Sequence, residues 1–154
     1  MSGCASAADA GALVALDDSS GTVCAPADAE GRAAFGISYV ENPSGEPVEV
    51  IEVELVGAEG MELLGFELRS PGDEDANAVG MDYDEFGPPS IALPQQVAAG
   101  ESRVALVGVA VSPGAGGEAD ALRITFRSSI GVQGTAETSI AMQVTPEGAT
   151  CDMG

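Results

Sequence analysis

Alternation of apolar and polar residues dominates this chain from about residue 24 onward and predicts β-strands. Residues 48–56 give the clearest strand, because glutamates separate its valines, isoleucine and leucine. Two apolar sets in this strand, one beginning at Val48 and the other at Ile51, are out of step by one residue. We therefore expect a β-bulge at Val50-Ile51, which would turn both sets toward the core and leave the glutamates in water.

Further strands are predicted from the same period of two, and turns rich in Gly and Pro separate them. Residues 104–111 are almost continuously apolar, which is typical of a central strand or of one whose outer face meets another surface. The predicted inward rows are Phe35, Ile37 and Tyr39; Leu64, Phe66 and Leu68; Leu122, Ile124 and Phe126; and Ala136, Thr138, Ile140, Met142 and Val144.

Seven or eight short strands with no convincing amphipathic helix predict an all-β protein, an antiparallel β-sandwich. Residues 41–48 and 97–102 resemble the strand-turn-strand segments of bacterial immunoglobulin-like envelope domains. This resemblance names a fold type and carries no functional residue. We expect a flexible spacer over 1–23, an immunoglobulin-like sandwich over 24–151 and a short tail over 152–154.

Composition narrows the function classes. The chain has 25 acidic residues against five arginines, and it lacks lysine and histidine, so its formal charge is −20. This charge repels phosphate backbones and anionic lipid surfaces, which argues against nucleic-acid binding and electrostatic docking to membranes. The missing residue types remove Ser-His-Asp, Cys-His and Schiff-base chemistry. We therefore predict a non-enzymatic protein, with a carboxylate-based hydrolase as an alternative that the sequence cannot locate.

The N-terminal tetrad ending in Cys4 resembles the lipobox of bacterial lipoproteins, with small residues on both sides of the cysteine. In that family the cysteine thiol carries a diacylglycerol. The resemblance implies an extracytoplasmic protein, either anchored to the cell membrane through a lipid on Cys4 or secreted. An ordinary exposed cysteine is the alternative. The apolar runs are shorter than the ~20 residues of a transmembrane helix, so the lipid would be the chain's contact with the membrane.

Cys24 and Cys151 bracket the region of alternating pattern, and we predict that they form a disulfide. Such a bond would tie the entry of the first strand to the exit of the last. Disulfides persist outside the cytosol, and lipidation of Cys4 would explain the odd third cysteine. A Cys4–Cys24 pairing and two free thiols in a reducing compartment are the alternatives.

An acidic segment at 73–84 has the spacing of a calcium-binding loop. Asp73, Asp75 and Asn77 occupy positions 1, 3 and 5, and Asp84 falls at position 12, where a bidentate carboxylate would complete the oxygen shell. Ala78 stands where such loops have glycine, so a solvated acidic loop is the alternative. The hypothesis of a Ca²⁺-stabilised interaction domain fails if millimolar Ca²⁺ does not shift thermal melting.

Two aromatic residues in the same acidic segment, Tyr83 and Phe86, are candidates for an exposed contact with a protein partner. The other phenylalanines in the predicted inward rows are expected in the core. The sequence therefore predicts a binding or structural module of the cell envelope, whose partner is an unidentified protein or envelope component.

Overall fold

The computed structural model describes residues 14–16, 21–70, 83–86, 90–138 and 140–151. These residues form eleven strands and the four-residue helix α2 (Tyr83–Phe86), which confirms the all-β class. Within the described ranges no helix is long and apolar enough to cross a membrane. The strands are β1 (Val14–Leu16), β2 (Gly21–Pro26), β3 (Arg32–Glu41), β4 (Val48–Val56), β5 (Glu62–Arg69), β6 (Gln95–Val97), β7 (Ser102–Ala110), β8 (Gly117–Ala119), β9 (Ala121–Ser128), β10 (Gln133–Glu137) and β11 (Ile140–Thr145).

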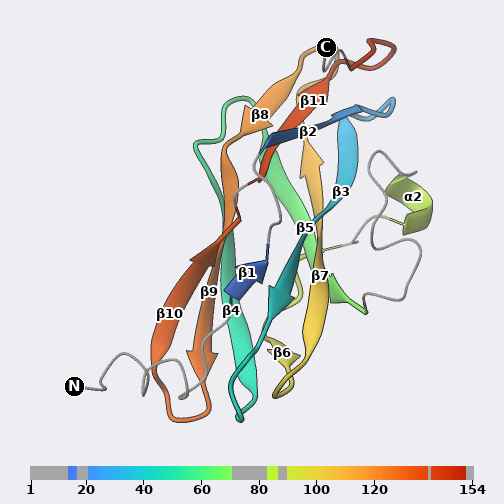
Figure 1. Cartoon of the computed structure of the whole chain (residues 1–154). Helices are drawn as coiled ribbons and strands as arrows, with labels where there is room; N and C mark the ends of the chain where they lie inside the picture. Colours follow the sequence, from blue (N-terminus) through green and yellow to red (C-terminus); the bar gives the residue numbers. More distant parts are fainter. Residues whose placement is uncertain (1–13, 17–20, 71–82, 87–89, 139, 152–154) are drawn as a thin grey trace.

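Two four-stranded antiparallel sheets, β1-β3-β7-β5 and β10-β9-β4-β6, form the sandwich, and a third sheet, β2-β11-β8, extends it at the end where the C-terminus lies (Figure 1). The predicted β-sandwich is confirmed. The number of strands exceeds the expected seven or eight because β1, β6 and β8 have only three residues each. Segments of that length are too short to display a period.

The apolar stretch at 104–111 is the central strand β7, which pairs with β3 on one side and β5 on the other. Ala105, Val107 and Val109 face the main core, together with Phe35, Phe66 and other buried side chains of the two sheets. Leu106 is fully buried although it lies outside that core cluster. The strand is therefore covered on both faces, as its two-sided apolarity predicted.

Three bulges decide which residues face the core. The predicted bulge in β4 is confirmed, because the register with β9 shifts between Val50 and Glu52. A second shift, between Gly36 and Ser38 in β3, was not predicted. It reverses the alternation that follows, so Val40 is buried while Tyr39 is 42% exposed. The expectation that Tyr39 belongs to the inward row was therefore wrong.

The third bulge lies in β5, where the register with β7 shifts between Leu63 and Gly65. Leu63 packs against the core, and Phe66 and Leu68 are buried in it, as predicted. Leu64, which was expected in the inward row, occupies the unpaired bulge position. A period of two cannot show which of two adjacent leucines, Leu63 or Leu64, faces the core.

The last predicted row is divided between two strands in different sheets. Ala136 belongs to β10, whereas Met142 and Val144 belong to β11. All three are buried, because the chain changes sheets without turning away from the core. β11 then pairs with β2 in parallel, whereas the other strand pairs of the three sheets are antiparallel.

The folded region begins before the predicted boundary at residue 24. β1 pairs with β3 in the register Val14 to Glu41, and β2 begins at Gly21. β1 lies within the stretch 1–23 that was expected to be a spacer, and β2 begins in it. Its Ala- and Ser-rich composition concealed two strands whose partners lie far away in the sequence.

A side-chain amide closes part of the free edge of β5. Gln95 Oε1 accepts a hydrogen bond from the Leu68 amide (2.8 Å), and Gln95 Nε2 donates to the carbonyls of Phe66 (3.1 Å) and Ala92 (2.9 Å). Gln95 itself begins β6 in the opposite sheet. One side chain thus replaces a neighbouring strand and links the two sheets at this side of the sandwich.

We expect Gln95→Leu to lower the free energy of unfolding by about 2 kcal/mol, because it leaves the Leu68 amide and the Phe66 carbonyl without partners. Gln96→Leu is the matched control, since Gln96 is exposed on the same short strand. Urea unfolding monitored by circular dichroism measures both variants. Equal stability of the two would contradict the role assigned to Gln95.

Candidate functional site

A disulfide joins Cys24 in β2 to Cys151, which follows β11, as predicted. The Cα atoms are 5.9 Å apart, and the two cysteines are separated by 127 residues in the sequence. β2 and β11 are already side by side as a parallel pair, and Gln143 lies opposite Cys24. The bond therefore fastens the first long segment of the fold to the last.

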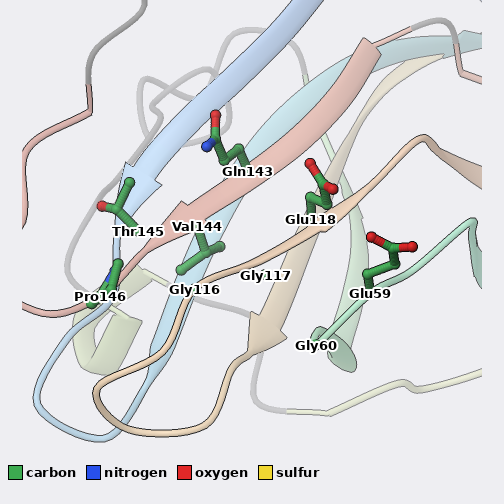
Figure 2. A pocket seen from close by; sticks show the side chains of 9 residues that line it. All are labelled: Glu59, Gly60, Gly116, Gly117, Glu118, Gln143, Val144, Thr145 and Pro146. Carbon is green, nitrogen blue, oxygen red and sulfur yellow. The ribbon is translucent and has the colours of Figure 1, made fainter.

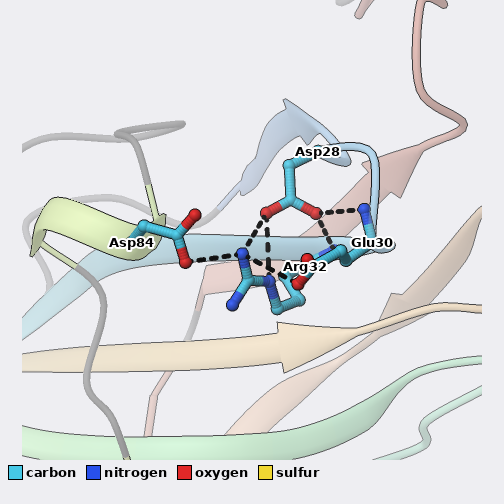
Figure 3. A network of polar contacts seen from close by, with 4 residues as sticks. All are labelled: Asp28, Glu30, Arg32 and Asp84. Atoms are coloured by element: carbon cyan, nitrogen blue, oxygen red, sulfur yellow. Dashed lines mark hydrogen bonds and ion pairs between the residues drawn. The ribbon is translucent and has the colours of Figure 1, made fainter.

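A cluster of three carboxylates surrounds Arg32 at the start of β3 (Figure 3). Arg32 forms ion pairs with Asp28 (3.0 Å), Glu30 (3.1 Å) and Asp84 (2.8 Å). Asp28 Oδ1 also accepts hydrogen bonds from the backbone amides of Glu30 and Arg32, which builds the turn between β2 and β3. Gly31 completes this turn with a φ of 82°. Because Asp84 belongs to α2, the cluster holds the short helix against the sheet.

The charged form of Asp28 is favoured in this cluster. Burial by itself raises the pKa of Asp28, but the backbone amides of Arg32 and Glu30 and the Arg32 guanidinium together hold the pKa below its ordinary value of 3.8. A depressed carboxyl pKa stabilises the fold above the ordinary value, and this contribution is lost as the pH falls through the folded-state pKa.

We therefore expect Asp28→Asn to melt at a lower temperature than the wild type near neutral pH, with the difference shrinking as the pH falls below about 3.8. Calorimetry across that pH range measures the difference. A difference that stays constant in acid would show that the charge of Asp28 does not stabilise the fold.

Tyr83 packs within the fold, whereas the sequence had suggested an exposed aromatic contact. The residue is only 8% exposed, and its ring lies 4.8 Å from Arg32 Cζ in a cation–π contact. Its hydroxyl end lies over Gly108 of β7, where a Cβ atom would come within 2.4 Å of Tyr83 Oη. Burial raises the pKa of Tyr83, although Arg32 acts in the opposite direction. The expected exposure of Tyr83 was therefore wrong.

Gly108→Ala tests the packing of the Tyr83 ring over Gly108. The new methyl group must displace the ring, so we expect the pKa of Tyr83 to fall toward its ordinary value of 10.0. An ultraviolet absorbance titration in a Tyr39→Phe background measures Tyr83 alone, because the chain has two tyrosines. An unchanged titration curve would contradict this packing.

The predicted calcium ligands are not assembled in the described residues. Asp73, Asp75 and Asn77 lie outside those residues, and so does the side chain of Phe86. Asp84 is described, and its carboxylate pairs with Arg32. Calcium binding stays a prediction, and a bidentate role of Asp84 would compete with its ion pair to Arg32. Cys4 likewise lies outside the described residues.

All five arginines lie in the described residues, and every one pairs with a carboxylate. Besides Arg32, the pairs are Arg69 with Glu67, Arg103 with Glu101, Arg123 with Glu54 and Glu137, and Arg127 with Glu49. Because the chain has no lysine or histidine, each of its side-chain cations lies beside a carboxylate. With 25 acidic residues against five arginines, carboxylates greatly outnumber cations.

An open hollow of about 470 Å³ lies beside β8 at the end of the sandwich (Figure 2). Glu59 and Glu118 face each other there across a single β-bridge, and Gln143 lies on the other side of Glu118. Both carboxylates are exposed to solvent. A general acid of a hydrolase is typically buried among apolar side chains, so this carboxylate pair lacks the environment that the hydrolase alternative needs.

Two aliphatic side chains project from the turn between β9 and β10. Ile130 is 71% exposed and Val132 is 55% exposed. The turn is well defined, because the Gly131 amide donates to the Ser128 carbonyl and the Ser128 amide to the Val132 carbonyl. Turns of this kind normally carry polar residues, so the aliphatic pair is not explained by the turn itself.

No family model matches the chain, and no curated protein matches it. Among solved structures, the chain is similar to the ASH/PapD-like domain of human CEP192 (PapD-like domain 7). The match has a TM-score of 0.42 and 8% sequence identity, and it covers 92% of this chain and 88% of that chain. A likeness this remote does not bear on function.

The residues that organise these contacts are only weakly indicated by the sequence pattern. Asp28 and Gly31 have the composition of a turn, but the ion pair between Arg32 and Asp84 joins residues 52 positions apart. The role of Gln95 is not indicated by the sequence, because two of its three partners, Phe66 and Leu68, belong to a strand that precedes it by many residues. These contacts depend on which segments the fold brings together.

Proposed function

We propose that this chain is a non-enzymatic module of the bacterial cell envelope, exported from the cytoplasm and tethered by a lipid on Cys4. The observation that carries the proposal is the disulfide between Cys24 and Cys151, because disulfides persist in oxidising compartments and are rare in the cytosol. The lipobox-like tetrad around Cys4 supplies the anchor and accounts for the third cysteine.

In this proposal the domain acts as a binding or structural module for proteins. Each of its five arginines forms an ion pair within the domain, and the 25 acidic residues greatly outnumber them, so the surface is negatively charged. Such a surface attracts basic partners and repels nucleic acids and anionic lipids. The tether would hold the domain at the membrane while its own charge keeps it away from anionic headgroups.

Mass spectrometry of the native protein under non-reducing conditions tests the proposal. We expect a Cys24–Cys151 bridged peptide and a diacylglycerol mass on Cys4. Free thiols at all three cysteines would overturn the assignment to an oxidising compartment. A bridged peptide with an unmodified Cys4 would overturn the lipid anchor and leave a secreted module.

A further inference from the structure

Strand β10 presents a free edge at one side of the sandwich. It is the outermost strand of the sheet β10-β9-β4-β6, and Figure 1 shows it at the left-hand margin of the molecule. β1 lies on the same side but in the opposite sheet, where it pairs with β3. In the described part of the chain, no strand pairs with the outer side of β10.

Hydrogen bonds at the two ends of β10 define which groups point outward. The Ser128 amide donates to the Val132 carbonyl at the turn (2.8 Å), and the Thr138 amide donates to the Leu122 carbonyl at the other end (3.0 Å). The register between these pairs is continuous. Because hydrogen-bonded and non-hydrogen-bonded pairs alternate in an antiparallel ladder, Gly134 and Ala136 bond to β9. The amides and carbonyls of Gln133, Thr135 and Glu137 therefore face away from the sheet.

Several devices that normally protect a strand edge are missing from the described part of β10's edge. β10 contains no proline or lysine, and its pairing with β9 has no bulge. The edge of β5, by comparison, is covered by Gln95 and by a bridge between Phe66 and Ile91. Exposed strand edges without protection are templates for an added strand.

The side chains along β10 define what kind of strand would fit. On the inner side, Gly134 and Ala136 are small, and the Phe126 ring lies against Gly134, where a Cβ atom would come within 2.7 Å of Cζ. The exposed aliphatic residues Ile130 and Val132 adjoin this row at the turn. Large apolar side chains of an added strand, placed opposite Val132, Gly134 and Ala136, would cover this surface.

On the outer side, Gln133, Thr135 and Glu137 are exposed and polar. Glu137 shares Arg123 with Glu54, so two carboxylates meet one guanidinium there. With a net charge of −20, the chain favours basic residues in this row of a partner strand. The same charge opposes pairing with a second copy of this chain.

We propose that the free edge of β10 binds an extended segment of a partner protein as an added antiparallel strand, in which aliphatic residues alternate with basic ones. The basic residues lie opposite Gln133, Thr135 and Glu137 and exchange backbone hydrogen bonds with them. This inference rests on the proposed role as a binding module and specifies its partner.

Binding of a labelled octapeptide of alternating arginine and valine, acetylated and amidated at its ends, tests the inference by fluorescence anisotropy. In the proposed register the arginine amides bond to β10 and the valine amides face solvent. Methylation of the arginine amide nitrogens is therefore expected to weaken binding at least about tenfold, whereas methylation of the valine amide nitrogens leaves it within a few-fold. Equal binding of the two methylated peptides would show attraction by net charge alone and would overturn the inference.

Thr135→Pro provides the matching change on the protein. It removes an outward amide that makes no ladder bond, so we expect weaker peptide binding with little change in melting temperature. Ala136→Pro is the control, because it removes an amide bonded to β9 and should destabilise the fold. Amide exchange of the wild type should slow at Gln133, Thr135 and Glu137 when the peptide is added.

Two further outcomes would also decide the question. A wild-type dimer in sedimentation that Thr135→Pro dissociates would assign the edge to a second copy and overturn the proposed partner. Absence of peptide binding, alongside a bridged Cys24–Cys151 and a lipidated Cys4, would overturn the β10 inference while leaving the cellular location of the module intact.

Discussion

Removal of the Cys24–Cys151 disulfide is expected to lower the free energy of unfolding by about 5 kcal/mol in the chain-entropy model, because the bond closes a loop of 127 residues. Without the bond, the unfolded chain gains conformational entropy, because the segments that form β2 and β11 are no longer held together. For a domain of this size we expect the melting temperature to fall by about 10–20 °C. Thermal melting of Cys24→Ser/Cys151→Ser, with and without reductant, measures the loss.

The comparison variant for this experiment is Cys4→Ser, because Cys4 takes no part in the bridge. Wild type and Cys4→Ser should lose the same stability when a reductant is added, and the double variant should not respond to it. A double variant as stable as the oxidised wild type would show that the parallel pairing of β2 with β11 is held by its backbone bonds and packing alone.

Loss of the Asn42 side chain is expected to have the second-largest effect, about 3 kcal/mol for Asn42→Ala. The residue is fully buried, and its Nδ2 donates to the carbonyls of Glu46 (2.7 Å), Val97 (3.1 Å) and Ala98 (3.3 Å). Its Oδ1 accepts from the hydroxyl and the amide of Ser44. Truncation to alanine removes all five of these hydrogen bonds at a buried position, and we expect the melting temperature to fall by about 6–12 °C.

Asn42 is expected to contribute this much to stability because it joins two turns at one end of the sandwich. Its backbone also accepts from the Gly100 amide (2.8 Å) and donates to the Glu101 carbonyl (2.9 Å). The turn after β3 is thus bound to the turn between β6 and β7. An Asn42→Ala variant should therefore loosen both turns together, which amide exchange at Ser44 and Gly100 would detect.

Asn42→Asp separates hydrogen bonding from size. The aspartate has nearly the same shape, but at neutral pH it offers an acceptor where the amide offers donors to three carbonyls. We expect it to be at least as destabilising as alanine at neutral pH and to recover in part when acid protonates the carboxyl. An Asn42→Asp protein with wild-type stability at neutral pH would contradict the assigned role of the Nδ2 donors.

Several features of this protein could be predicted because they depend on neighbours in the sequence. The misaligned valines and isoleucine of β4 required a bulge, and the bulge is present between Val50 and Glu52. The two-sided apolarity of 104–111 required a strand covered on both faces, and β7 is the central strand of its sheet. The positions of Cys24 and Cys151 at the limits of the alternating pattern favoured their pairing.

Other features could not be predicted because their causes lie far away in the sequence. The bulge that exposes Tyr39 is recorded only in the pairing of β3 with β7. Tyr83 is buried because Gly108, 25 residues further along, leaves room for its ring and because Arg32 lies beside it. The hydrophilic composition around Tyr83 predicted an exposed ring, and it does not indicate the space above Gly108 that the ring occupies.

Local periodicity, residue spacing and the sum of charges were enough to predict the class of the fold, the central strand, the disulfide pair and the acidic surface. The strand edges depend on tertiary contacts: Gln95 covers β5, Arg32 holds α2, and among the described residues no strand pairs with the outer side of β10. The physical reason is that an edge is defined by which strands fail to pair. Pairing depends on contacts between distant segments, which no local pattern in the chain encodes.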